Sequence, residues 1–203
     1  MKTNTISKQN AETTASRGLK IVMIGEGGQG IQTVAKIVTH SAFEFGYHAS
    51  YLPNFGTEQR GGLSIAFIQI SESEIISPKF KTADLFILVS NRDVARTLQY
   101  IGPTTNVLYD EDILLEDAKQ QLARHSKNLV PIRAFYQATH AFTERSFNVI
   151  LLGIIIGLVD LNLKELAVAQ MTEKFKKYYE KKPELKTTNE QAFQLGLTMT
   201  TQK

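Results

Sequence analysis

The chain contains no cysteine among its 203 residues. A disulfide framework, a thiol nucleophile and a cysteine-ligated zinc or iron–sulfur site are therefore excluded within this chain. A reducing, cytoplasmic setting is consistent with this composition. The 42% of hydrophobic and 21% of charged residues are typical of a globular domain rather than a disordered or fibrous protein.

Long apolar runs are also missing. The longest, Val149–Val159, falls well short of the ~20 residues of a membrane span and is typical of a buried core helix. The N-terminal segment lacks the apolar stretch of a secretory signal and is rich in Thr, Ser, Asn and Gln. We therefore expect no membrane segment, a disordered tail over residues 1–18 and a folded domain over residues 19–203.

The net charge of +3 is concentrated in two segments. Residues 1–18 sum to +2 and residues 173–182 sum to +3, so the rest of the chain sums to −2. A lysine excess along one helix is typical of a solvated face, and no basic platform with interleaved aromatic residues is present. We therefore expect no nucleic-acid partner.

Short β-branched runs alternate with helical spacing over the first two thirds of the chain. The helical spacing predicts a helix that begins at Ile31 and stops at Gly46, and Asn91 is placed to cap a helix that ends near Tyr100. Strands are expected at Leu19–Ile24, Tyr47–Leu52, Leu63–Ile70, Asp84–Val89, Val107–Tyr109 and Leu129–Ala134, and helices near Ser146–Leu161, Lys164–Lys182 and Asn189–Thr198. This order predicts a single α/β domain, three-layered and Rossmann-like, with a mainly parallel sheet and C-terminal helices.

The first candidate site is the segment from Gly25 to Gly30, which fits G-x-G-x-x-G between a strand and a helix. Helix N-terminal amides at such a turn can meet a pyrophosphate. Against ordinary dinucleotide binding, Glu26 puts a negative charge there, and the second strand ends in Tyr51-Leu52-Pro53 without an acid to hold a ribose. Two alternative roles stay open for this segment: a turn that needs glycine for backbone geometry alone, and a contact with an anion or a partner.

The second candidate site is the loop Pro53-Asn54-Phe55-Gly56-Thr57-Glu58-Gln59-Arg60-Gly61-Gly62, at the carboxyl end of a predicted strand. Ligand sites of α/β domains lie at this edge. Arg60 on a glycine-rich loop can offer a planar fork to a phosphate or carboxylate. Alternatively, Arg60 pairs with Glu58 or Glu26 and only fixes the loop.

Other candidates are weaker. The histidines form no i, i+4 pair, so we expect no metal site: His40, His48, His125 and His140. Asp110, Glu111 and Asp112 could hold Mg²⁺, but acids at a helix start are usually capping residues. The residues alone thus give two glycine loops and one arginine, without a catalytic constellation.

Six segments together resemble a known family: GEGGQG, PNFGTEQRGG, Ser77-Pro78, Ala83-Asp84, the helix with Asn148 and Leu152-Gly153, and Asn189 to Gly196. The chain resembles the gamma-type subunit or domain of 2-oxoacid:ferredoxin (acceptor) oxidoreductases, from about Lys20 to Gly196. Glu26 departs from that family, which usually carries a small residue, an aromatic residue or Arg there.

The resemblance implies an enzyme that converts a 2-oxoacid and coenzyme A to acyl-CoA and CO₂, with ferredoxin as the electron acceptor. Thiamine diphosphate with Mg²⁺ and the iron–sulfur clusters would belong to partner chains of alpha, beta and delta type, because this chain has no cysteine and no Gly-Asp-Gly…Asn pattern. The chain would be inactive alone.

The resemblance also implies that the two glycine loops face coenzyme A as a shared ligand. The residues expected to contribute are Gly25, Gly27, Gly28, Gln29, Gly30, Gly56, Glu58, Arg60, Gly61 and Gly62. Two other functions stay open: a stand-alone nucleotide-binding module, and a purely structural assembly subunit whose loops only dock partners. The sequence does not distinguish the 2-oxoacid or the stoichiometry.

Overall fold

A computed structural model describes residues 18–56, 62–159 and 161–199. Of the expected disordered tail, residues 1–18, all but Gly18 therefore lie outside the described residues. Six strands form one sheet in the order β2-β3-β1-β4-β5-β6. The strands are β1 (Leu19–Glu26), β2 (His48–Phe55), β3 (Leu63–Ser71), β4 (Ala83–Leu88), β5 (Ile101–Asp110) and β6 (Leu129–Ile132). The helices are α2 (Ile31–Phe45), α3 (Val94–Thr97), α4 (Glu116–His125), α5 (Ala134–Ala141), α6 (Phe147–Val159), α7 (Lys164–Lys181) and α8 (Glu184–Met199), with 3₁₀ turns η1 (Leu98–Tyr100) and η2 (Glu144–Ser146).

The sheet is mainly parallel, as predicted, with β3 as the exception. β3 pairs antiparallel with both β1 and β2, whereas β1, β4, β5 and β6 pair in parallel. The connection from β2 to β3 consists of residues 56–62, which is too short for the crossover that a parallel neighbour requires. Every strand but β3 therefore ends at the same edge of the sheet.

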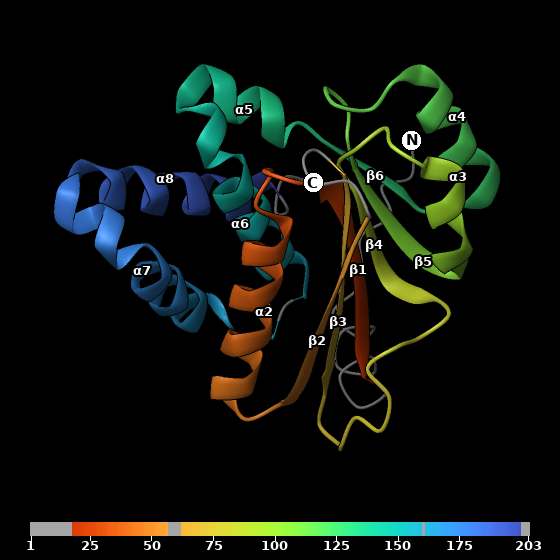
Figure 1. Cartoon of the computed structure of the whole chain (residues 1–203), viewed down its shortest axis with the longest axis horizontal. Coiled ribbons are helices and arrows are strands. Elements are labelled where there is room, and N and C mark those ends of the chain that lie inside the picture. Colours follow the sequence, from red (N-terminus) through yellow and green to blue (C-terminus); the bar gives the residue numbers. More distant parts are fainter. Residues whose placement is uncertain (1–17, 57–61, 160, 200–203) are drawn as a thin grey trace.

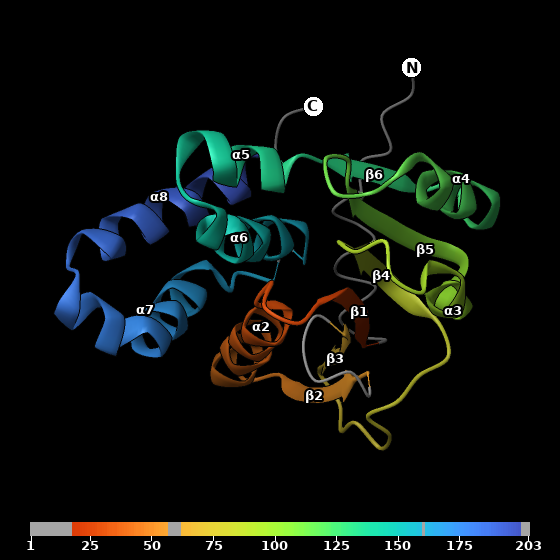
Figure 2. The same cartoon turned by 45° about the horizontal axis from the view of Figure 1, so that its top comes forward.

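Helices cover both faces of the sheet, which confirms the three-layer prediction (Figures 1 and 2). On one face α3 and α4 pack over a cluster that includes Val22, Phe67 and Phe86. On the other face α2 and α6 pack over a cluster that includes Ile21 and Met23. Alternate residues of β1 thus point to opposite cores, as the period of a strand requires.

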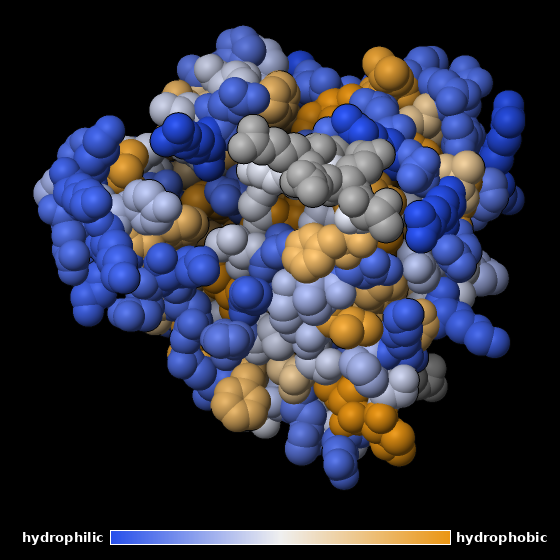
Figure 3. All heavy atoms as spheres, viewed as in Figure 1, coloured by the Kyte–Doolittle hydropathy of each residue, from blue (hydrophilic) through white to orange (hydrophobic). Residues whose placement is uncertain are grey.

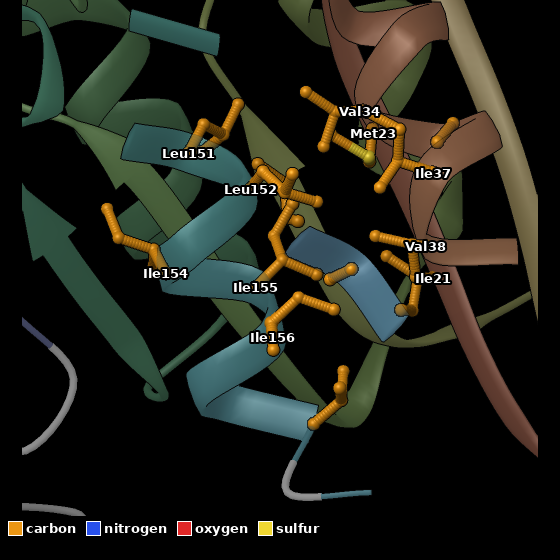
Figure 4. Packing of buried hydrophobic residues seen from close by; sticks show 14 of the residues in the cluster. Ile21, Met23, Val34, Ile37, Val38, Leu151, Leu152, Ile154, Ile155 and Ile156 are labelled. Atoms are coloured by element: carbon orange, nitrogen blue, oxygen red, sulfur yellow. The ribbon is translucent and has the colours of Figure 1, made fainter. Parts of the chain in front are cut away.

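Helix α6 is apolar on all sides and is buried on nearly all of them, as expected for Val149–Val159. Leu152 and Ile155 project toward Val34 and Val38 of α2, whereas Ile154 projects to the other side (Figure 4). Each such side chain contributes about 1.5–3 kcal/mol when fully buried. This packing fixes α6 against the beginning of α2, where the first glycine turn lies.

The outer helices differ from α6 in surface character. Hydrophilic side chains cover α7 and α8 where they face the solvent (Figure 3), which agrees with a solvated lysine face. Within the described ranges, no helix combines the length and the apolar character that crossing a bilayer requires.

Three local predictions were wrong. The loop expected from Pro53 begins only at Gly56, because residues 53–55 still pair with β3. Asn91 does not cap α3, whose N-cap is Asp93 in a left-handed conformation with φ of 46°. Its amide instead donates to the carbonyl of Ile113 at 2.7 Å and accepts from the Leu115 N–H at 2.7 Å, so it joins two loops. Helix α5 was not anticipated, because its eight residues, AFYQATHA, are too few to show a clear helical periodicity.

Candidate functional site: two glycine loops at the carboxyl edge of the sheet

The carboxyl ends of β1, β2, β4, β5 and β6 lie at one edge of the sheet, the upper edge in Figure 1. The turn from β1 into α2 begins there, and so does the connection from β2 to β3. In open α/β sheets this edge is where ligands bind. Both glycine loops of the sequence therefore reach the location that was expected of a site.

The first glycine loop is a tight turn whose backbone requires glycine at two positions. Gly28 has φ of 106° and Gly30 has φ of 79°, a region that residues with a Cβ rarely adopt. Gln29 braces the turn from within: its Oε1 accepts from the Glu26 N–H at 2.7 Å, and its Nε2 donates to the Val89 carbonyl at 3.0 Å. The Gln29 side chain therefore holds the turn to the end of β4.

Gly25 lies in β1 just before this turn, and close packing explains why it is glycine. A Cβ there would lie 2.5 Å from Cγ1 of Ile31 and 2.6 Å from Oε1 of Gln29. The start of α2 thus approaches the strand at a distance that a larger residue would prevent.

The two glycine loops touch each other. The Gly27 N–H of the first loop donates to the Gly62 carbonyl of the second loop at 3.0 Å. The Gly56 N–H donates to the Leu63 carbonyl at 2.8 Å, which joins the two ends of the second loop. Of the predicted site residues, Glu58, Arg60 and Gly61 lie outside the described residues. Gly62 is nevertheless fixed beside the first turn, so the described end of the second loop adjoins the first loop.

The N-terminus of α2 is at this contact. Its N-cap is Gly30, and its first turn contains no acidic residue. The positive end of the helix dipole is therefore not compensated by a carboxylate of its own first turn, an arrangement that favours an anion.

Glu26 is the acidic residue nearest to this turn in sequence, and other side chains already hold its carboxylate. Oε1 accepts from the hydroxyl of Ser90 at 2.9 Å, and Oε2 lies 3.4 Å from Nε of Arg92. The Ser90 hydroxyl also accepts from the Arg92 N–H at 3.0 Å. The unfavourable charge identified in the sequence is therefore paired with an arginine from the loop after β4.

A polar network joins α2 to the neighbouring strands behind the turn. Gln32 of α2 donates to the Ser64 hydroxyl at 2.8 Å and accepts from the Tyr51 hydroxyl at 2.5 Å. Burial raises the pKa of Tyr51, so its hydroxyl stays protonated and remains a donor at neutral pH. Gln32, Tyr51 and Ser64 thereby fix α2 relative to β2 and β3.

Asn148 of α6 lies directly against Gly30. A Cβ on Gly30 would lie 2.3 Å from Nδ2 of Asn148 and 2.9 Å from its Cβ. The Asn148 Oδ1 is buried and has no hydrogen-bond partner among the described residues. Helix α6 therefore touches the first glycine turn through this carboxamide.

An acidic pair, Asp110 and Asp112, lies farther along the same edge, at the end of β5 and just beyond it. The buried Asp110 carboxylate accepts from the Asp112 N–H at 3.0 Å and from the Phe135 N–H at 2.9 Å, while Asp112 forms a two-point ion pair with Arg133. Burial raises the pKa of Asp110, partly opposed by these backbone donors. Within the described ranges, no group of three or more His, Cys, Asp or Glu residues could hold a metal ion.

The strand order argues against dinucleotide binding of the usual kind. In that mode the acid that holds the ribose ends the strand beside β1. Here β3 lies between β1 and β2, so the end of β2 is two strand spacings, roughly 10 Å, from β1. The G-x-G-x-x-G pattern therefore occurs without the adjacent strand whose terminal acid would hold the ribose of a dinucleotide.

Comparison with known proteins decides the family. The sequence model for pyruvate ferredoxin/flavodoxin oxidoreductase matches residues 20–199. The chain belongs to this oxidoreductase family. It is 29% identical over 159 residues to the pyruvate/ketoisovalerate oxidoreductases common subunit gamma of Pyrococcus abyssi. This alignment covers 74% of this chain and 84% of that subunit. Membership of this family confirms the resemblance inferred from the sequence.

Longer relatives contain the matched part as one portion. Subunit VorA of the ketoisovalerate oxidoreductase of Methanothermobacter marburgensis is 27% identical over 73% of this chain, which spans only 30% of VorA. A solved 2-oxoglutarate:ferredoxin oxidoreductase from Magnetococcus marinus, with 2-oxoglutarate, coenzyme A and succinyl-CoA bound, has a TM-score of 0.78 and 22% identity. The match covers 91% of this chain and 31% of the solved chain, so this likeness shows a shared fold.

The structure thus brings together the described residues of both predicted loops. It adds three residues that the sequence did not nominate for the site, namely Ser90, Arg92 and Asn148. A signal existed for the first two, since Ser90-Asn91-Arg92 directly follows a strand that ends at the ligand-binding edge. For Asn148, which comes from a helix far along the chain, only the family resemblance offered a hint.

Proposed function

We propose that this chain is the gamma-type subunit of a cytoplasmic, multi-subunit 2-oxoacid:ferredoxin oxidoreductase that converts a 2-oxoacid and coenzyme A to acyl-CoA and CO₂. The observation that carries the proposal is the hydrogen bond from Gly27 to Gly62, which joins the two glycine loops in a member of this family. Relatives named as oxidoreductase subunits, and a structural neighbour solved with coenzyme A, support it.

The redox groups of such an enzyme do not fit the residues of this chain. It contains no cysteine for an iron–sulfur cluster, and its described part contains no group of acids and histidines suited to a metal ion. We assign thiamine diphosphate with Mg²⁺ to alpha- and beta-type partners, and the clusters that reduce ferredoxin to a delta-type partner. This chain is then inactive by itself.

Its own contribution is to bind the phosphates of coenzyme A at the joined glycine loops. The N-terminus of α2 and the backbone amides of Gly28 and Gly30 favour an anion there, whereas the amides of Gly27 and Gln29 already donate to the carbonyls of Gly62 and Glu26. Arg60, with Gly61 and Gly62, completes the site from the second loop, because a guanidinium pairs with phosphate through two parallel hydrogen bonds.

The experiment is a pull-down of the tagged chain from its native cells, followed by an assay of CoA-dependent 2-oxoacid oxidation with a viologen dye. Co-purification of thiamine-diphosphate and iron–sulfur subunits with activity is expected, and it identifies the 2-oxoacid. A chain that is recovered alone and inactive overturns the proposal, and NAD, FAD or ATP binding by the purified chain supports the stand-alone nucleotide-binding module.

A variant then tests the site. Arg60→Ala should raise the KM for coenzyme A in the complex and leave the KM for the 2-oxoacid unchanged. The exposed Lys174 of α7 provides the control variant Lys174→Ala, because it removes a positive charge away from the glycine loops. If Arg60→Ala changes only the yield of the complex, the loops dock partners and do not bind coenzyme A.

A further inference from the structure

Asn148 brings a side-chain amide to the start of α2, where the phosphates of coenzyme A are proposed to bind. It is the second residue of α6, and its side chain occupies the space that a Cβ on Gly30 would need. The atom nearest to that hypothetical Cβ is Nδ2, followed by the Cβ of Asn148 at 2.9 Å. A hydrogen-bond donor from a helix far along the chain therefore lies against the N-cap of α2.

The carboxamide has the opposite orientation to that of a helix cap. A capping asparagine turns its side-chain oxygen toward the N–H groups of the first turn. The N-cap of α2 is a glycine without a side-chain cap, and Oδ1 of Asn148 is not among the three atoms nearest to the hypothetical Cβ of Gly30. Asn148 therefore adds a donor to a helix terminus that already presents donors, and it does not supply the acceptor that this terminus lacks.

The oxygen of the same carboxamide is in an unfavourable place. Oδ1 is buried and accepts no hydrogen bond from the part of the chain that the structure describes. A buried acceptor without a partner loses its bond to water and gains none in return, so it destabilises the folded chain. An alanine at position 148 would avoid this loss. Stability of the fold therefore does not explain the asparagine.

The first turns of the two helices leave these donors available to an anion. Neither α2 nor α6 has an acidic residue in its first turn. The carboxylate of Glu26, which precedes the turn in sequence, accepts from the hydroxyl of Ser90 and is paired with Arg92. An anion at the start of α2 would therefore meet backbone amides, Nδ2 of Asn148 and the positive end of the α2 dipole.

We propose that Asn148 is a binding residue for coenzyme A and that its Nδ2 donates a hydrogen bond to a phosphate oxygen at the N-terminus of α2. Gly30 lacks a Cβ, which lets the carboxamide reach this terminus. The buried Oδ1 follows from the same orientation, because the reversed carboxamide would turn an oxygen toward the phosphate. This inference rests on the proposed function and assigns to it a residue of α6.

The test uses the purified complex with the variants Asn148→Ala and Asn148→Asp, and with the exposed Gln194→Ala of α8 as the control. Asn148→Ala should raise the KM for coenzyme A about tenfold, as for a lost hydrogen bond to a charged group, and leave the KM for the 2-oxoacid unchanged. Asn148→Asp should raise it further, because a carboxylate repels the phosphate. With pantetheine, an acceptor without phosphates, Asn148→Ala should differ from the wild type no more than the control does.

The melting midpoint of the complex separates binding from a structural role. Asn148→Ala should leave the midpoint unchanged while it weakens the binding of coenzyme A. A lower midpoint with an unchanged KM for coenzyme A would show that Asn148 is structural and that the inference is wrong. An equal rise of the KM for coenzyme A and for pantetheine, or a smaller rise in Asn148→Asp than in Asn148→Ala, also overturns it, because no phosphate then faces the carboxamide.

Arg60→Ala distinguishes failure of this inference from failure of the proposed function. If Arg60→Ala raises the KM for coenzyme A whereas the Asn148 variants do not, the inference fails and the proposed site survives. If none of these variants raises it, the proposed coenzyme A site fails as well.

Discussion

Replacing Gly30 with alanine separates two reasons why the first turn requires glycine. At Gly30 the backbone has φ of 79°, and an added Cβ would lie 2.3 Å from Nδ2 of Asn148. Gly28, two residues earlier, has φ of 106° and open space around its hypothetical Cβ. Gly28→Ala therefore measures backbone strain alone, whereas Gly30→Ala measures strain together with a collision.

The expected magnitudes follow from this difference. A left-handed conformation costs a residue with a Cβ about 1–2 kcal/mol, which applies to both variants. Overpacking against a neighbouring group adds about 1–3 kcal/mol, which applies to Gly30→Ala only. At about 2–4 °C per kcal/mol for a chain of this length, Gly30→Ala should unfold at least about 2 °C below Gly28→Ala.

Thermal unfolding of the purified chain, followed by circular dichroism, measures both midpoints. A third variant, Asn148→Ala, removes the atom nearest to the new Cβ and leaves a Cβ contact at 2.9 Å, so Gly30→Ala combined with Asn148→Ala should recover part of the loss. Asn148→Ala alone should cost little, because its buried Oδ1 forms no hydrogen bond with the part of the chain that the structure describes. Equal midpoints for the two glycine variants, or no recovery in the double variant, would refute the contact between α6 and the turn.

Features that depend on neighbouring residues were predictable from the sequence. The spacing of apolar residues in Ile31–Phe45 gave a helix with the correct bounds, and Gly46 ends it with φ of 108°. The apolar run in α6 gave a buried helix for the same reason, because an all-round apolar surface must be covered.

The position of β3 depends on contacts between residues far apart in sequence. Its pairing with β2 was predictable, whereas its pairing with β1 was not. The short connection after Phe55 requires β3 to run back along β2. The pairing of its other edge with β1, from Leu19 opposite Ile70 to Glu26 opposite Leu63, follows from the packing of the whole sheet. A local pattern contains no information about this second neighbour.

The candidate site shows the same division. The position of both glycine loops at one edge followed from the rule for parallel strands. The partners of Glu26 did not, because Ser90 lies 64 residues away and reaches the carboxylate only after β4 has paired with β1. Asn91 shows most clearly what local sequence cannot predict. Its side-chain amide forms hydrogen bonds with residues 22 and 24 positions later instead of capping the adjacent helix.

Two further substitutions test the packing of the C-terminal helices and the buried acid at the sheet edge. Gly153→Ala should lower the melting midpoint by several degrees, because its Cβ would lie 2.2 Å from the Phe193 carbonyl oxygen, whereas the exposed Gln194→Ala on the same helix pair should not. Burial raises the pKa of Asp110, so the folded chain binds a proton more tightly than the unfolded chain does. The free energy of unfolding should therefore fall as the pH rises from about 4, the ordinary aspartate value, through the raised pKa, and level off above it. Asp110→Asn should remove this dependence on pH. It should also lower the free energy of unfolding by about 1–3 kcal/mol at neutral pH, because the new amide NH₂ would face a backbone N–H such as that of Phe135. Urea unfolding at several pH values measures both effects, and a slope that persists in Asp110→Asn would show that another group titrates in this range.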